Sequence, residues 1–216
     1  MTANLCASPA ADFWPEPFGR RWDAHAECAG SASYRAVLPL VNTHEPRVIV
    51  WGDGSYSAEE QRAGSAIFYG DGNPRNRCYR CPQPPDNDRA ELFSFLQCLL
   101  HEDRPLLYCT DATYVHEGFM ELRSRRRARA WFRRPLRAEL IPNWDIWLRV
   151  DTLARRRPQH SILTCWGRGH ARPAQAYAGQ TTDLLCHGNA CVDILAARGS
   201  RLSPGSSEAV PHTLPA

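Results

Sequence analysis

The chain has 216 residues, of which 43% are hydrophobic and 10% aromatic, and this composition excludes a wholly disordered protein. The formal net charge is only +3, yet all 26 basic residues are arginines, whose planar guanidinium groups bind phosphate oxygens bidentately. The sequence contains neither an apolar run long enough to span a bilayer nor a secretory signal. We therefore expect an intracellular protein, in the cytoplasm or nucleus, with no membrane partner.

Composition divides the chain into three regions. Residues 1–46 are rich in Ala, Ser, Pro and Glu without a clear period, which predicts an irregular N-terminal extension. Residues 199–216 contain Pro, Gly and Ser at high density, which predicts a disordered C-terminal tail. The folded domain is therefore expected to cover residues 47–198.

Within this domain the periodicity of apolar residues predicts an alternation of strands and helices. Strands are predicted at 48–55, 63–69, 75–80, 105–109 and 161–166, and helices at 88–100, 112–122, 143–155 and around 189–197. Residues 70–74 have the composition of a hairpin turn. A meander of three strands followed by alternating helices and strands predicts an α/β domain with a mixed sheet.

The last predicted helix contains a charge that does not suit its position. Asn189 is a suitable N-cap, and Ala190, Ile194 and Ala197 then recur at the spacing of one buried stripe. Asp193 projects from the same stripe. Because a buried carboxylate is costly unless a positive charge meets it, the pattern predicts a cationic partner for Asp193.

Three further acids interrupt apolar elements. Asp53 and Asp111 follow the apolar parts of the first and fourth strands, and Glu91 lies among the apolar residues that open the first long helix. Any one of them is more often a cap or part of a surface ion pair. Four acids brought together at strand ends would raise one another's pKa values, and a divalent metal such as Mg²⁺ resolves this repulsion.

The acids lie in segments that resemble the four acidic motifs of type 1 ribonuclease H, in the same order. A helix start and a loop resemble two further segments of that family, N-x-D-L-W and W-x-x-G-H-A. The six segments are Asp53-Gly54-Ser55, Asn87-Asp88-Arg89-Ala90-Glu91-Leu92, Thr110-Asp111-Ala112-Thr113-Tyr114-Val115, Asn143-Trp144-Asp145-Ile146-Trp147, Trp166-Gly167-Arg168-Gly169-His170-Ala171 and 188–196.

The resemblance covers residues 47–198 and implies an RNase H-like fold, with a five-stranded mixed sheet flanked by helices. In that sheet three antiparallel strands are followed by two parallel ones. The resemblance also implies that the protein is an endonuclease that hydrolyses the RNA strand of RNA–DNA hybrids, leaving 3′-hydroxyl and 5′-phosphate ends. Two Mg²⁺ ions, replaceable by Mn²⁺, would be held by Asp53, Glu91, Asp111 and Asp193, and the hybrid duplex is the only partner implied.

Two segments depart from the family pattern near the expected nucleic-acid contacts. The second motif often has two asparagines before its arginine, and here Asn87 is followed by Asp88. Thr113 stands where a glutamine is usual. Asn87, Arg89 and Thr113 are accordingly the expected nucleic-acid contacts of these motifs, with weaker minor-groove binding than usual.

The catalytic-loop histidine has two candidates. His170 matches the family segment and would assist proton transfer or product release, a general acid–base role. It precedes Asp193 by 23 residues, whereas the family usually has about ten. His187 lies closer in the chain, and we keep it as the alternative to the favoured His170.

A run of arginines follows the short helix predicted at 112–122. Such a run is usually a solvated face, but its position matches a basic segment that some type 1 enzymes use to bind nucleic acid, a role that makes binding strongly salt-dependent. The expected contacts are Arg123, Arg125, Arg126, Arg127, Arg129, Arg133 and Arg134.

The chain has nine cysteines, and this odd number favours reduced thiols in a reducing compartment. Cys78 and Cys81 form a C-x-x-C pair, and Cys186 and Cys191 flank His187. A structural zinc site built from these pairs is the alternative to buried free thiols.

A second function class remains open beside the nuclease. The chain could be a weak or inactive nucleic-acid-binding module, including one derived from a retroelement RNase H domain. Cleavage of a hybrid, compared with binding alone, separates the two.

Overall fold

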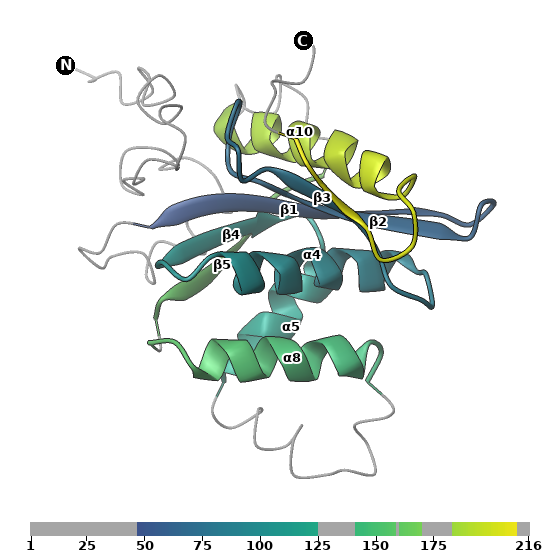
Figure 1. The fold of residues 1–216 in the computed structure, drawn as a ribbon. Coiled ribbons are helices and arrows are strands. Elements are labelled where there is room, and N and C mark those ends of the chain that lie inside the picture. The colour runs from purple at the N-terminus through teal and green to yellow at the C-terminus, as the bar shows by residue number, and fades with distance from the viewer. Residues whose placement is uncertain (1–46, 125–140, 159, 170–182, 211–216) are drawn as a thin grey trace.

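The structure is a computed structural model, and it describes residues 47–124, 141–158, 160–169 and 183–210. The predicted N-terminal extension at 1–46 lies outside these residues. The described chain forms one sheet with helices on both faces (Figure 1).

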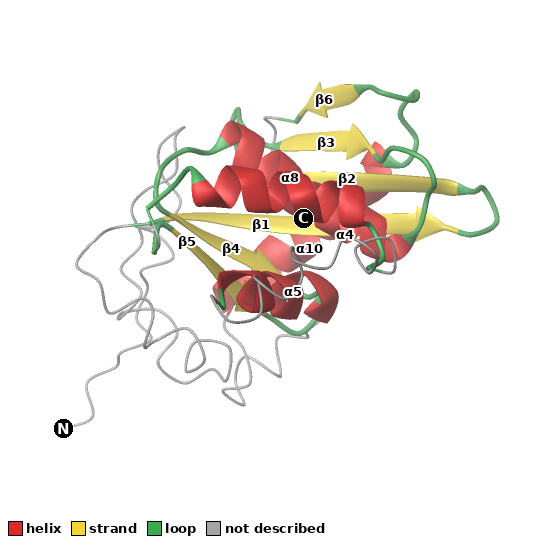
Figure 2. Cartoon of the chain, turned by 90° about the horizontal axis from the view of Figure 1, so that it is seen from below, coloured by secondary structure: helices red, strands yellow, loops and turns green. Residues whose placement is uncertain are grey.

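The sheet has six strands in the order β5-β4-β1-β2-β3-β6 (Figure 2). β1 (Val48–Ser57), β2 (Arg62–Phe68) and β3 (Arg77–Arg80) form the predicted antiparallel meander. β4 (Leu106–Thr110) and β5 (Ile162–Trp166) extend the sheet in parallel on the other side of β1. This arrangement confirms the predicted mixed sheet and adds one strand to it.

Among the described residues, three helices cover one face of the sheet and one helix covers the other (Figure 1). The first three are α4 (Asn87–His101), α5 (Thr113–Arg123) and α8 (Trp144–Arg155), and the lone helix is α10 (Asp183–Gly199). None of the helices described here is long and apolar enough to cross a bilayer.

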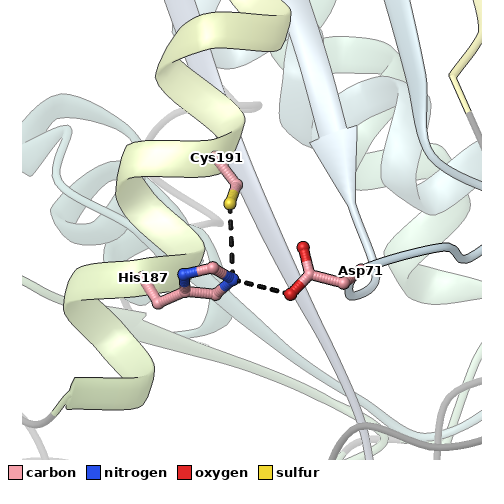
Figure 3. A group of neighbouring side chains, drawn as sticks. All are labelled: Asp71, His187 and Cys191. Atoms are coloured by element: carbon pink, nitrogen blue, oxygen red, sulfur yellow. Dashed lines mark hydrogen bonds and ion pairs between the residues drawn. The ribbon is translucent and has the colours of Figure 1, made fainter. Parts of the chain in front are cut away.

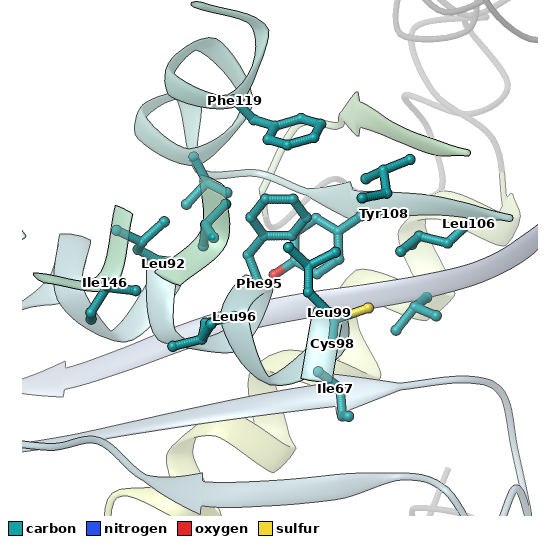
Figure 4. Packing of buried hydrophobic residues seen from close by; sticks show 14 of the residues in the cluster. Ile67, Leu92, Phe95, Leu96, Cys98, Leu99, Leu106, Tyr108, Phe119 and Ile146 are labelled. Carbon is teal, nitrogen blue, oxygen red and sulfur yellow. The ribbon is translucent and has the colours of Figure 1, made fainter. Parts of the chain in front are cut away.

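The two faces of the sheet bury separate hydrophobic clusters. On the face of α4, the rings of Phe95, Tyr108 and Phe119 pack together, with centroids 4.7 and 5.0 Å from that of Phe95 (Figure 4). On the face of α10, Trp51 and Phe68 pack against Val192 and its neighbours. Burial on both faces explains why β1 and β4 begin with continuous apolar runs.

The expected disorder of residues 199–216 is wrong for the part that the structure describes. β6 (Ser207–Ala209) pairs antiparallel with β3, and Val210 is buried. A salt bridge between Arg198 and Glu208 connects the end of α10 to this strand. The composition suggested disorder because turn residues fill 203–206, yet their function is to return the chain to the sheet edge.

The predicted start and buried stripe of the last helix are also wrong. α10 begins at Asp183, so Asn189 lies inside the helix, and Ile194 is 53% exposed. The buried face instead contains Leu185, Gly188, Val192, Leu195 and Ala196. At Gly188 an added Cβ would lie 2.1 Å from the indole of Trp51, so this helix packs against the sheet at a glycine.

Candidate metal centre and nucleic-acid cleft

Three aspartates converge where β1, β4 and α10 meet. Trp51 pairs with Cys109 in the parallel register of β1 and β4, so Asp53 and Asp111, each two residues further along, lie side by side. Asp193 reaches them from α10. Oxygen atoms of Asp53, Asp111 and Asp193 all lie within 4.8 Å of one another, as the sequence motifs predicted.

Glu91 joins this group because α4 passes very closely over β1. An added Cβ at Gly54 would lie 2.3 Å from the backbone nitrogen of Glu91, so only glycine fits at this crossing. The Ser65 hydroxyl donates a hydrogen bond of 2.7 Å to the Ala90 carbonyl and holds the helix against β2. The glycine of the Asp-Gly-Ser motif therefore sets the separation between the strand of Asp53 and the helix of Glu91.

We predict that Gly54→Ala separates β1 from α4. The free energy of unfolding should fall by about 1–3 kcal/mol, the usual cost of overpacking, and Mn²⁺ binding should weaken because Glu91 moves. Urea unfolding and Mn²⁺ titration measure the two effects. Gly167→Ala is the matched control, since an added Cβ there meets no atom of the described residues within 4 Å, and it should change stability by less than about 0.5 kcal/mol. Equal behaviour of the two variants would contradict the prediction.

Burial and mutual repulsion disfavour the ionised forms of Asp53 and Glu91. Desolvation raises the pKa of Asp53 well above its usual value, and the charges of Asp193 and Asp111 raise it further. Desolvation likewise raises the pKa of Glu91, with added repulsion from Asp53 and Asp111. The Glu91 Oε2 atom is buried and has no hydrogen-bond partner among the described residues. These acids only repel one another, so the ionised site requires a positive charge from another source.

Glu102 is a buried carboxylate that this fold stabilises with arginine side chains. Its side chain is fully buried, and Arg75 and Arg104 lie 2.7 and 2.8 Å from it. Burial alone would raise the pKa of Glu102, but hydrogen bonds from Arg104 and the two positive charges hold it below the usual value. At Asp53 and Glu91 the strongest charged neighbours are acids instead. An all-oxygen donor set of this kind suits a hard divalent cation.

Asn189 belongs to this centre, although the sequence suggested only a helix cap. Its Nδ2 atom lies 3.4 Å from Asp111 Oδ2 and 3.3 Å from Asp193 Oδ1, and the residue is 9% exposed. The amide thus donates to two of the clustered carboxylates. The available signal was its spacing of four residues from Asp193 within one helix, which places both side chains on the same face.

The acids open into a cleft of about 650 Å³. Asn87 and Thr113, two of the predicted nucleic-acid contacts, line this cleft together with the acids. Asp88, which departs from the family pattern, lines it too. The remaining lining residues are Gly54, Ser55, Tyr56, Ala112 and Tyr114.

Arg89 has a structural role that the sequence did not suggest, and the structure corrects its predicted place at the nucleic acid. Its guanidinium group forms a bidentate pair with Asp145 at 2.9 and 2.6 Å and donates to Asn143 Oδ1 at 3.1 Å. Only 7% of Arg89 is exposed. The arginine of the second motif therefore links α4 to the start of α8, where the Asn-x-Asp segment begins.

Most of the arginines predicted to bind nucleic acid fall in a segment that the structure does not describe. Arg125, Arg126, Arg127, Arg129, Arg133 and Arg134 lie outside the described residues, as does His170. Arg123 is described, and its Nη1 atom donates to the Ile162 carbonyl at 3.0 Å. Its guanidinium group thus holds the end of α5 to β5.

The alternative histidine, His187, faces a different group of residues. Its Nε2 atom lies 2.9 Å from Asp71 Oδ2, in the turn after β2, and 3.5 Å from Cys191 Sγ (Figure 3). This geometry does not favour His187 as the catalytic-loop histidine. Cys78 and Cys81 are buried free thiols, as the first of the two interpretations expects. They belong to separate hydrophobic clusters, beneath α10 and beside α4 respectively, which does not favour the alternative of a shared zinc site.

The sequence that carries this centre matches a known protein family. Residues 45–201 match the sequence model of the RNase H family, which is more than half of the chain. The chain belongs to the RNase H family. The four acids and the mixed sheet all lie within the matched residues, apart from the edge strand β6.

Curated relatives and solved structures agree with this family. Ribonuclease H of Alkalilimnicola ehrlichii is 34% identical over 91 residues, covering 41% of this chain and 59% of the relative. Ribonuclease H of Phenylobacterium zucineum is 28% identical over 130 residues, covering 58% and 80%. The chain covers only 59% of the Alkalilimnicola ehrlichii protein and 53% of ribonuclease H of Pectobacterium carotovorum. The solution structure of the PFV RNase H domain has a TM-score of 0.51 at 20% identity, covering 70% of this chain and 93% of that domain, and shares the fold.

Proposed function

We propose that this protein is an endoribonuclease that hydrolyses the RNA strand of RNA–DNA hybrids with the help of two divalent cations, Mg²⁺ or Mn²⁺. The observation that carries the proposal is the convergence of three aspartates within 4.8 Å of one another, beside the buried Oε2 atom of Glu91, which has no hydrogen-bond partner among the described residues. Membership of a family named for ribonuclease H supports the same activity.

The protein's own residues have distinct tasks in this reaction. Asp53, Glu91, Asp111 and Asp193 would hold the cations, which stabilise negative charge on the phosphodiester and activate water. Asn189 donates to Asp111 and Asp193 and fixes the orientation of both carboxylates. Trp166 donates from Nε1 to the Asp111 carbonyl at 2.8 Å and so holds the end of β4 beside β5.

The substrate would lie across the cleft lined by Asn87 and Thr113. A water oxygen forms a bond to phosphorus as the bond to the 3′-oxygen breaks, which leaves a 3′-hydroxyl and a 5′-phosphate. His170 is proposed to assist proton transfer or product release, as its match to the family segment implies.

The substrate test compares a labelled RNA–DNA hybrid with double-stranded RNA, double-stranded DNA and single-stranded RNA, each incubated with Mg²⁺. Cleavage confined to the RNA strand of the hybrid, with 3′-hydroxyl products, supports the proposal. Binding of the hybrid without cleavage would favour the alternative, a nucleic-acid-binding module. One solved neighbour, a foamy viral protease-reverse transcriptase, was determined in complex with dsDNA, and double-stranded DNA is therefore included in the comparison.

The arginine run after α5 is proposed to bind phosphates of the duplex. Changing Arg125, Arg126 and Arg127 to alanine should weaken hybrid binding and lower the slope of log K against log salt by about one for each phosphate that is no longer neutralised. Fluorescence anisotropy at several salt concentrations measures this slope. Arg201→Ala, an exposed arginine outside the run, is the control and should leave the slope unchanged. An unchanged slope in the triple variant would remove this role.

A further inference from the structure

A second cluster of metal-ligating side chains lies apart from the four acids. It consists of Asp71 in the turn after β2, and His187 and Cys191 on α10 (Figure 3). One ligand atom from each residue lies within 4.8 Å of the other two. His187 and Cys191 are four residues apart on one helix, the spacing that places two metal ligands on the same face.

The contacts of Asp71 and Cys191 with His187 converge on a single ring nitrogen. Both the Asp71 carboxylate and the Cys191 thiol approach the same ring nitrogen, Nε2. A neutral imidazole that donates from Nε2 to the carboxylate can give the sulfur, a weak acceptor, only a share of the same N–H. A metal ion among the three atoms would accept an electron pair from each of them.

The same geometry argues against a cysteine nucleophile. In a Cys-His-Asp arrangement the thiol and the carboxylate occupy opposite ring nitrogens, so that the acid orients the base. Here both partners share Nε2. The carboxylate, the thiol and Nε2 therefore face one common point, as the ligands of a metal ion do.

The distances also suit a tetrahedral ion. With Zn–N and Zn–S bonds of about 2.0 and 2.3 Å, tetrahedral ligands lie roughly 3.5 Å apart, and Nε2 is 3.5 Å from Cys191 Sγ. The Nε2 to Asp71 Oδ2 distance, 2.9 Å, needs only a small outward movement of an exposed side chain. The Phe68 ring packs edge-on against the imidazole at 6.4 Å and limits its rotation.

We propose that Asp71, His187 and Cys191 form a Zn²⁺ site, with water as the fourth ligand. The mixed O, N and S donors suit Zn²⁺ and not Mg²⁺, which prefers oxygen ligands and has no affinity for a thiol. The ion would connect α10 to the turn after β2. Because His187 is 45% and Asp71 32% exposed at the side chain, the ion exchanges with solvent, unlike one enclosed by four protein ligands.

The test is a Co²⁺ titration of the full chain, stripped of metal under reducing conditions, in excess Mg²⁺ to fill the carboxylate centre. We expect one Co²⁺ per chain with a thiolate-to-cobalt charge-transfer band in the near ultraviolet, which Zn²⁺ abolishes by displacement. Cys191→Ser should remove the band. Asp71→Asn and His187→Gln, which change exposed side chains, should each weaken Co²⁺ binding more than about tenfold.

Two controls separate this site from other thiols and from the acids. Cys186→Ser changes a half-buried thiol on the same helix and should keep the band, and so should Asp53→Asn. Absence of the band in the parent protein, or its persistence in Cys191→Ser, overturns the proposal. Unchanged affinity in both Asp71→Asn and His187→Gln overturns it too, even where Cys191→Ser fails to fold.

Discussion

Asp53→Asn should abolish cleavage of the hybrid while making the metal-free protein more stable. If Asp53 holds a cation as proposed, its loss should cost about 4 kcal/mol in transition-state stabilisation, a rate loss of about a thousandfold. In the metal-free fold the same change removes a buried charge repelled by Asp193 and Asp111. The melting temperature without metal should rise by about 2–4 °C for each 1 kcal/mol of relief.

The pH dependence of this effect has a definite sign. Because folding raises the pKa values of Asp53 and Glu91, the folded state binds their protons more tightly than the unfolded state does. Their destabilising contribution is therefore present above the raised pKa values and disappears as the pH falls through them. Thermal unfolding at several pH values, measured once in a chelator and once in excess Mg²⁺, tests this pH dependence. A stability gain from Asp53→Asn that stays the same in Mg²⁺ would contradict a metal site at these acids.

Glu102→Ala should have the opposite effect, a loss of stability without a direct effect on the cleft. Arg75 and Arg104 would lose the buried carboxylate between them, and breaking such an arrangement costs about 3–5 kcal/mol. The lower value is expected here, because the two arginine side chains are 26% and 39% exposed and can reach water. Urea unfolding at neutral pH measures the loss. Glu60→Ala, at an exposed pair 3.7 Å from Arg62, is the control and should cost less than about 1 kcal/mol.

The pH dependence of Glu102 is also opposite to that of the clustered acids. Its pKa is lower in the folded protein, so its contribution is complete above the unfolded value of about 4.3 and is lost as the pH falls through the folded value. Glu102→Gln should therefore flatten the acid limb of the stability curve. An acid limb identical to that of the parent protein would show that the arginines do not stabilise this charge.

The sequence was sufficient for those parts of the centre that depend on local pattern. Asp53 and Asp111 were recognisable because each follows an apolar run, and Glu91 because it interrupts an apolar helix face. Each of these elements has a period that burial on the sheet imposes. The order of the motifs indicates the family without reference to their spatial arrangement.

Features that depend on long-range contacts were not predictable in this way. Arg89 resembled a nucleic-acid contact because its partner, Asp145, lies in another helix far along the chain. On α10 more than one group of apolar residues recurs with a helical period. The packing of Gly188 against Trp51 determines which of these groups faces the sheet and is buried. Asn189 is a suitable cap by residue type, but so are Thr181, Thr182 and Asp183 in the sequence at the observed start of α10, and the local sequence does not choose between the two starts.

The pairing of β6 with β3 has a consequence for how the protein is made. An open strand edge invites pairing with other chains, and β6 covers the outer edge of β3. β3 ends at residue 80, whereas β6 begins at residue 207. At ribosomal rates of about 5–20 residues per second, roughly 6–25 s separate the synthesis of the two strands. During that interval the nascent sheet has an unprotected edge, and a chain ending before residue 207 would retain it permanently.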